Sequence, residues 1–357
     1  MYMSRPISII IDSTILKDNL SIIRKISFNS KFWAVVKSNA YGHGIRYIWK
    51  LLSDADGFAL VELEDALFLR KMGYVKPILL LEGFFEKNEL EIFDRYHLTS
   101  CIHSEWQINA LEHFKFSAPL DIYVKFNSGM NRFGFDFKDF FVIWNKLRSL
   151  KSIGDMTMMT HFVNVDDLNH VKDTRRYISS IIDDYKIKCC FANSAVILFS
   201  SYFNYDWVRS GILLYGLSPT GNYRDISKYG LKPVMTFSSK IIFIRDINIG
   251  DILGYGNYIV KEKKRIGIVA CGYSDGYPRN ISISTPVSVD GVITQTIGLI
   301  SMDTLIVDLT YCPKADIGSN VELWGNNIGI DKVACMSNTI SYELISSLSS
   351  RIPISLK

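Results

Sequence analysis

Short apolar runs alternate with amphipathic stretches over the first two-thirds of the 357 residues, and this alternation constrains the fold most. The stretches at 104–114 and 137–147 place apolar residues three and four positions apart, which is typical of helices. Strands that alternate with helices form a parallel sheet, and about eight such units predict an α/β (β/α)8 TIM-like barrel. A doubly wound open sheet is the alternative. The expected strands are 32–36, 57–61, 77–81, 98–102, 120–126, 155–160, 188–192 and 206–213.

The pattern changes after Pro219, where a turn cluster at 220–223 is followed by short β-type runs separated by Gly, Pro, Asn and Asp. These runs predict a C-terminal all-β domain, either a barrel or a sandwich. We therefore expect a barrel over 1–228, with a strand at 7–11 that is free to pair with the second domain, and the β domain over 229–357. The expected runs are 235–244, 265–271, 286–289, 295–300, 305–309 and 320–324.

The composition excludes several classes of protein. A hydrophobic fraction of 48% with 21% charged residues indicates a folded chain with a sizeable core. The net charge of +4 is too small and too dispersed for a nucleic-acid surface, no uncharged apolar run approaches the ~20 residues of a membrane span, and no signal peptide is visible. The six cysteines form no C-x-x-C pair, so we expect reduced core cysteines and no metal site. The sequence thus favours a cytoplasmic protein with no nucleic-acid and no membrane partner.

The most informative stretch runs from Ala34 to Gly44 and reads AVVKSNAYGHG. An apolar strand delivers Lys37 at its carboxyl end, which is the catalytic face of a barrel, and a polar turn follows. A lysine at the mouth of an apolar core is desolvated, which lowers the pKa of its amine and makes it a nucleophile toward a carbonyl. From position alone, an ordinary strand-end lysine that reaches water is the more frequent case.

The same stretch resembles the cofactor-lysine motif of the alanine racemase family, whose members use pyridoxal 5'-phosphate. Seven further segments match the family in the expected order, so the resemblance covers nearly the whole chain. It implies a pyridoxal-phosphate-dependent isomerase that interconverts L- and D-alanine and supplies D-alanine for peptidoglycan. The matching segments are KFNSGMNRFG at 125–134, HF at 161–162, NSA at 193–195, VRSGI with YG at 208–216, GYG with GYSDGYPR at 254–279, SMD at 301–303 and ISYE at 340–343.

A pyridoxal cofactor needs an amine for a Schiff base, donors for its phosphate and a partner for its ring nitrogen. Lys37 supplies the amine, and Ser194 with the N–H groups of Gly211 and Ile212 are suitable phosphate donors. Ser194 could instead be a helix N-cap. In the family, Arg209 lies against the ring nitrogen, and because arginine stays protonated, that nitrogen is left unprotonated, which suits racemisation. The resemblance adds Tyr41, His161, Asn193 and Tyr342 to the cofactor site.

Racemisation needs an acid/base group on each face of the substrate's Cα. By the resemblance, Lys37 serves one face and Tyr255 the other. A free tyrosine has a pKa near ~10, and in the family a hydrogen-bond chain through His161 to Arg209 lowers it. Because Tyr255 lies in the β domain, the resemblance implies that it reaches the barrel mouth of a second subunit. The expected partner is therefore a second copy of this chain, in a head-to-tail homodimer with shared active sites.

The resemblance also implies a substrate side to the site. Arg132 would lie near the substrate carboxylate, and Met302 would contribute its backbone from the partner subunit. Lys125 matches a lysine that is carbamylated in many members, where it orients the arginine. The entry corridor would be formed by Asp166, Tyr273, Arg279 and Asp303.

The chain departs from the family pattern at three positions. Leu299 stands where many members have an arginine, which puts the charge of the entry corridor in question. Ser38 and Val163 each replace a frequent alanine, and no departure touches the Schiff-base lysine or either proton-transfer residue.

The sequence allows four alternatives to be compared with an alanine racemase. A racemase of broader specificity, acting on serine or larger side chains, is one alternative. A decarboxylase with the same two-domain plan would carry a glycine-rich phosphate loop and a catalytic cysteine in the β domain, and neither stands at a convincing position. A non-catalytic pyridoxal-phosphate carrier would lack the β domain. A barrel that binds sugars or phosphates without the cofactor would not account for Tyr255, Met302 and Tyr342.

Overall fold

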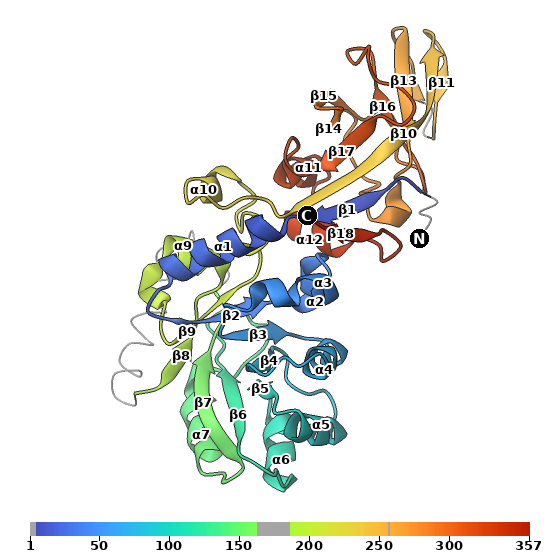
Figure 1. Cartoon of the computed structure of the whole chain (residues 1–357). Helices are drawn as coiled ribbons and strands as arrows, with labels where there is room; N and C mark the ends of the chain where they lie inside the picture. The colour runs from blue at the N-terminus through green and yellow to red at the C-terminus, as the bar shows by residue number, and fades with distance from the viewer. Residues whose placement is uncertain (1–4, 163–185, 256–257) are drawn as a thin grey trace. The chain divides into compact units, whose positions relative to one another are not determined.

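The computed structural model describes residues 5–162, 186–255 and 258–357 (Figure 1). Contacts divide the chain into two units. The barrel unit comprises Leu20–Ala40 and Trp49–Leu214, and the C-terminal unit comprises the residues up to Asn19, Tyr41–Ile48 and Tyr215–Lys357. None of the helices in the described residues is long and apolar enough to cross a membrane. Asp166 and Val163 lie outside the described residues.

An eight-stranded parallel sheet with the order β8-β7-β6-β5-β4-β3-β2-β9 forms the barrel unit. The N–H of Arg209 on β9 donates to the carbonyl of Ala192, just after β8, so backbone hydrogen bonding links the two ends of the order. The predicted TIM-like barrel is confirmed. Its strands are β2 (Lys31–Val35), β3 (Gly57–Leu60), β4 (Ile78–Leu80), β5 (Thr99–Ile102), β6 (Leu120–Lys125), β7 (Ile153–Met159), β8 (Lys188–Cys190) and β9 (Trp207–Ser210).

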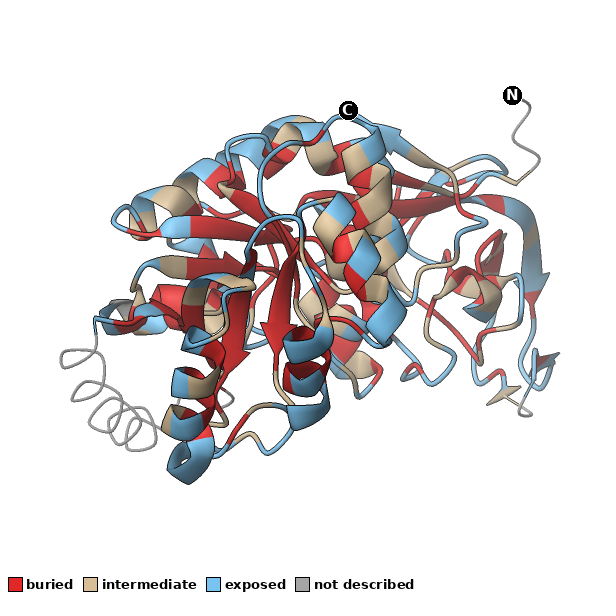
Figure 2. Ribbon diagram, turned by 90° about the horizontal axis from the view of Figure 1, so that it is seen from below, coloured by how far each residue is buried: buried red, intermediate tan, exposed pale blue. Residues whose placement is uncertain are grey.

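The barrel strands β3, β4 and β5 are buried along their whole length, as is typical of parallel strands covered on both faces (Figure 2). The helix α7 (Phe137–Arg148) buries Phe140, Ile143, Trp144 and Leu147, and this spacing of three and four residues explains why the sequence pattern located it. The helix expected at 104–114 is α6 (Glu105–His113). Other α-helices in the described residues of this part of the chain are α1 (Ser13–Ile26), α2 (Lys37–Tyr41), α3 (Ile45–Ile48), α4 (Leu63–Lys71), α5 (Leu90–Arg95) and α9 (Ser194–Phe199).

A mostly antiparallel sheet with the order β15-β14-β17-β10-β1-β18 forms the C-terminal unit, and β13 pairs with both β10 and β16. The strand β1 (Ser8–Ile11) lies antiparallel to β10 (Met235–Ile247) and parallel to β18 (Ile354–Leu356), so both ends of the chain enter one sheet. The other strands are β11 (Ile252–Leu253), β12 (Tyr258–Ile259), β13 (Lys264–Val269), β14 (Pro286–Val289), β15 (Val292–Gln295), β16 (Leu305–Asp308) and β17 (Asn320–Trp324).

The strand expected at 295–300 is wrong, because β15 ends at Gln295. The turn residues Asp290 and Gly291 both have positive φ, at 46° and 87°, which gives a tight two-residue hairpin that starts β15 directly at Val292. The apolar residues Ile297 and Ile300 that suggested a strand are instead buried outside any strand. The described part of the unit also contains short helices, among them α10 (Arg224–Ser227), α11 (Ile330–Met336) and α12 (Ser341–Ser346).

Candidate active site

Lys37 follows the last residues of β2 and is half-buried. Residues 38–40 after it adopt left-handed helical backbone angles, with φ between 51° and 55°, although none of them is glycine. Each such residue costs about 1–2 kcal/mol, so the surrounding structure must hold the turn in place. The N–H of residue 40 donates to the carbonyl of Val36 at 2.9 Å, and the N–H of residue 38 donates to the Glu62 carboxylate at 3.1 Å. A strained, firmly held turn thus carries the lysine.

The surroundings of Lys37 lower the pKa of its amine. Burial lowers the pKa of Lys37 most, and the positive charge of Arg132 lowers it further. The carboxylates of Glu82 and Glu62 oppose this shift, and Arg209 adds a weaker lowering effect. Since only a neutral amine can accept a proton or attack a carbonyl, this pKa shift suits the predicted role.

Arg209 lies at the end of β9 and is only 6% exposed. Its Nη1 donates to the carbonyl and to the Sγ of Cys190, and its Nη2 donates to the carbonyl of Thr160 at 2.7 Å. The guanidinium is therefore fixed by main-chain oxygens at the ends of β8 and β7. Sequence reasoning placed Arg209 in the site but missed these partners, because a backbone acceptor leaves no residue signature.

Lys125 ends β6 and is buried, with its Nζ 5.0 Å from the ring centroid of Phe133. Burial lowers the pKa of Lys125 most, and the nearby cations Arg209 and Arg132 lower it further. The thiol of Cys101 is close enough to interact, but burial raises its pKa to about 11, so it stays protonated. The surroundings of Lys125 therefore shift its amine toward the neutral form.

His161 follows the end of β7 and is surrounded by positive charge. Burial lowers the pKa of His161 to about 3, and the charges of Arg209, Arg132 and Lys125 act in the same direction. The imidazole is therefore neutral throughout the physiological pH range.

A neutral buried His161 predicts how stability depends on pH. The unfolded chain takes up a proton on this histidine below its ordinary pKa of ~6.5, whereas the folded protein does so only near 3, so stability falls as the pH drops between these values. We expect His161→Gln to lose about 2 kcal/mol less unfolding free energy than the original protein between pH 7.5 and pH 5. Urea unfolding at both pH values measures this difference. Equal losses in the two proteins would contradict a neutral histidine.

Ser194 and Asn193 begin the short helix α9 after β8. The N-cap is Asn193 and not Ser194, because the Asn193 side chain accepts a hydrogen bond from the N–H of Val196 at 3.0 Å. The Ser194 side chain is buried, and its Oγ accepts from the N–H of Gly211 at 3.1 Å. The expected phosphate donors Ser194 and Gly211 are therefore next to each other, and Ile212 follows directly in sequence.

Tyr41 and Tyr342, which the resemblance assigns to the cofactor site, lie in the C-terminal unit. Their ring centroids are 6.2 Å apart, and Tyr41 also packs at 5.0 Å against the ring of Tyr215. Burial raises the pKa of Tyr342 to about 12 and also raises that of Tyr41, so both phenols are protonated donors. Gly42 permits this packing, because its φ is +73° and a Cβ there would lie 1.9 Å from the carbonyl oxygen of Ile345.

The expected proton-transfer and substrate-side residues of the C-terminal unit lie at its surface. Tyr255, in the turn after β11, is 65% exposed. Tyr273 and Met302 are exposed too, and the Arg279 guanidinium stacks 5.9 Å from the ring centroid of Tyr273. Asp303 is the residue after Met302 and accepts hydrogen bonds from Arg5 and Arg351.

The charge of the barrel site suits an anionic ligand. Lys37, Lys125, Arg132 and Arg209 are close enough to act on one another or on His161 electrostatically. Such a cluster suits the phosphate of pyridoxal phosphate and the carboxylate of an amino acid, and it supplies the amine that the aldehyde requires. Among the described residues, no group of three or more His, Cys, Asp or Glu side chains is arranged to hold a metal ion.

The structure has the plan that the resemblance implies, a parallel barrel with a lysine just after a strand, followed by a β unit that carries tyrosines. Residues 11–219 match the family model "Alanine racemase, N-terminal domain", and residues 234–356 match "Alanine racemase, C-terminal domain". The chain belongs to the alanine racemase family. The family predicted from the motifs is confirmed, and with it the isomerase class and the pyridoxal-phosphate cofactor.

Curated relatives and solved structures agree with this assignment. The chain is 50% identical to an alanine racemase of Erwinia tasmaniensis over 99% of both chains. It is 48% identical to a catabolic alanine racemase of Salmonella typhimurium, over 98% of this chain and 99% of the relative. The crystal structure of a biosynthetic alanine racemase from Pseudomonas aeruginosa matches with a TM-score of 0.94 at 35% identity, covering 99% of each chain.

Proposed function

We propose that the protein interconverts L- and D-alanine, with Lys37 and Tyr255 as the two groups that move the proton at Cα. The observation that carries this proposal is the position of Lys37, which combines a strand end, a strained turn and a lowered pKa. The bound cofactor supplies an electron sink for the charge left at Cα. The neutral amine of Lys37 accepts or returns the proton on one face of the substrate, and Tyr255 does so on the other.

Arg209 favours racemisation over other reactions at the same carbon. Its guanidinium is fixed by two backbone carbonyls and remains protonated, so it acts only as a hydrogen-bond donor toward a ring nitrogen. A donor that keeps this nitrogen unprotonated makes the electron sink shallow, and the proton then returns to Cα quickly. Arg132 would bind the substrate carboxylate from the barrel unit.

The remaining cofactor residues bind and orient. Ser194, with the N–H groups of Gly211 and Ile212 and the phenols of Tyr41 and Tyr342, would hold the phosphate. The neutral His161 and Asn193 complete the pocket, and Asn193 donates to the carbonyl of Phe162 at 3.0 Å. Tyr273, Arg279 and Asp303 would form the entrance with Asp166.

Lys125 is proposed to be carbamylated. Its lowered pKa supports this, because only a neutral amine adds carbon dioxide. The resulting carboxylate would offset the surrounding positive charge and pair with Arg132. Without this modification, Lys125 would add no negative charge beside Arg132 and Arg209.

The active sites are proposed to be shared between two copies of the chain in a head-to-tail homodimer. Tyr255 is exposed, and large apolar side chains near it in sequence, Ile249, Ile252 and Ile259, are exposed as well. Exposed apolar residues around a polar functional side chain are typical of a surface that another protein covers.

Mixing two inactive variants tests this arrangement. We expect Lys37→Ala and Tyr255→Phe each to be inactive, and we expect activity to return when the two are refolded together. In a shared-site heterodimer one site has both residues intact, so random mixing should restore about one quarter of the original activity. If both residues of a site came from one chain, no mixture would be active. Sedimentation of the original protein gives the oligomeric state independently.

The use of the product stays a prediction. A supply of D-alanine for peptidoglycan and a role in alanine breakdown are both compatible with the reaction, since relatives described as biosynthetic and as catabolic both match the chain. Alanine is proposed over serine or larger substrates because every relative named above is an alanine racemase.

A further inference from the structure

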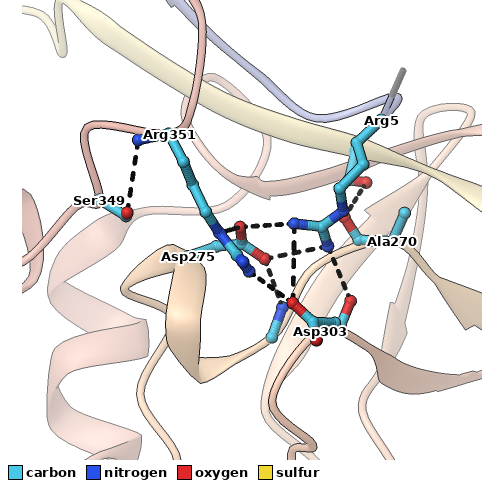
Figure 3. A network of polar contacts seen from close by, with 8 residues as sticks. Arg5, Ala270, Asp275, Asp303, Ser349 and Arg351 are labelled. Atoms are coloured by element: carbon cyan, nitrogen blue, oxygen red, sulfur yellow. Dashed lines mark hydrogen bonds and ion pairs between the residues drawn. The ribbon is translucent and has the colours of Figure 1, made fainter. Parts of the chain in front are cut away.

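Two arginines from opposite ends of the chain meet in the C-terminal unit (Figure 3). The strands β1 and β18 are parallel, with Ile9 opposite Ile354, so both strands start at the same end of the sheet and the residues before them lie close together. Arg5 lies just before β1 and Arg351 just before β18. The pairing of the two chain ends therefore brings these guanidinium groups together.

Both arginines bind the carboxylate of Asp275, which has no exposed side-chain surface. Arg5 donates from Nη1 and Nη2 at 2.9 and 3.3 Å, and Arg351 donates from Nε at 2.7 Å. The N–H of Gly272 supplies a further bond at 2.9 Å. A buried carboxylate is stable only when it is paired and hydrogen-bonded in this way.

The same two arginines also bind Asp303. Nη2 of Arg351 donates to its Oδ1 at 2.7 Å, and Nη2 of Arg5 donates to its carbonyl oxygen at 2.9 Å. Each guanidinium therefore bridges Asp275 and Asp303. Without the two positive charges, the two carboxylates would repel one another, and one of them would be buried unpaired.

The loops joined by these arginines carry the substrate-side residues of the proposed function. Tyr273 lies two residues before Asp275, and Met302 directly precedes Asp303. The N–H of Tyr273 donates to the carbonyl of Ser301 at 3.0 Å. A Cβ at Gly272 would lie 2.3 Å from the carbonyl oxygen of Met302, so the two loops touch through their backbones.

We propose that Arg5 and Arg351 are positioning residues for substrate binding, which set the spacing of Tyr273 and Met302 through Asp275 and Asp303. This inference rests on the proposed function, which places Tyr273 and Asp303 at the entrance of the site, and on the substrate-side role that the resemblance implies for Met302. The arginines bind those two aspartates and act on the substrate only through the loops. Their loss should therefore weaken substrate binding and leave proton transfer by Lys37 unaffected.

The test measures kcat and KM for L-alanine in the cofactor-saturated Arg351→Ala and Arg5→Ala variants. We expect KM to rise about tenfold in each, with kcat within about twofold of the original, because uniform binding is lost and transition-state stabilisation is kept. Arg351→Lys should recover only part of the loss, since an ammonium lacks the planar fork that reaches both carboxylates.

Arg265→Ala is the matched control. Arg265 also joins loops of the C-terminal unit, through the carbonyls of Cys312 and Ala315, but it bridges neither aspartate. The KM of Arg265→Ala for L-alanine should stay unchanged. If this KM rose as much as in the Arg5 and Arg351 variants, the effect would come from a general destabilisation of the unit, and the proposal would be overturned. A fall in kcat with unchanged KM in Arg351→Ala would also overturn it.

A second variant and the activity of the original protein separate the possible outcomes. If the alanine variants fail to fold, Arg351→Lys decides alone, and a folded Arg351→Lys protein with an unchanged KM overturns the inference. If the original protein does not racemise alanine, the proposed function fails. If it does, and the arginine variants keep their KM, only the positioning role fails.

Discussion

Replacing Lys37 with alanine is expected to abolish racemisation in both directions, by at least about 10⁴-fold. In the proposed function, the variant loses both the amine that would bind the cofactor covalently and the acid/base group on one face of the substrate, and each of these contributes strongly to catalysis. The measurements are D-alanine formation and the absorbance band expected from an imine between the cofactor and Lys37.

Lys31→Ala is the control for this change. Lys31 begins the same strand β2, is exposed, and lies at the opposite end from Lys37. Its removal should leave turnover and absorbance nearly unchanged. A Lys37→Ala protein that keeps the cofactor's absorbance would contradict the assignment of this lysine.

Tyr255→Phe is expected to lower turnover about 10²- to 10⁴-fold, the range that a positioned general acid/base group contributes. Because the side chain is 65% exposed, the variant should fold normally and bind the cofactor with unchanged absorbance. The assay follows D-alanine from L-alanine and L-alanine from D-alanine.

Tyr311→Phe removes a hydroxyl from a still more exposed tyrosine of the same unit and should have no effect. If Tyr255→Phe kept full turnover, the second acid/base group would have to be another residue, although Lys37 could retain its role.

The sequence predicted the barrel well because its strands are buried on both faces and bounded by polar residues, as in β3 and β5. Helix α7 was equally clear from its buried stripe. The strand expected at 295–300 was wrong because buried loop residues resemble a strand when only their hydrophobicity is read. Strands of two residues, such as β11 and β12, are too short to give any periodic signal.

Most residues of the candidate site could be named from motifs, but their physical surroundings could not. The left-handed turn at 38–40 contains no glycine, so the residue types gave no reason to predict positive φ angles there. The oxygens that hold Arg209 belong to the backbone of Thr160 and Cys190. The pairing of Arg5 with Arg351 depends on two strands from opposite ends of the chain becoming neighbours, which local sequence does not encode.

Alanine racemisation is tested most directly by the conversion of L-alanine by the purified protein saturated with pyridoxal phosphate. Two enantiomers have equal free energy in water, so a racemase is expected to bring L- and D-alanine to equal amounts, whichever enantiomer is supplied. Failure to form D-alanine in a protein whose Lys37 holds the cofactor would contradict the assignment of alanine racemisation to this site.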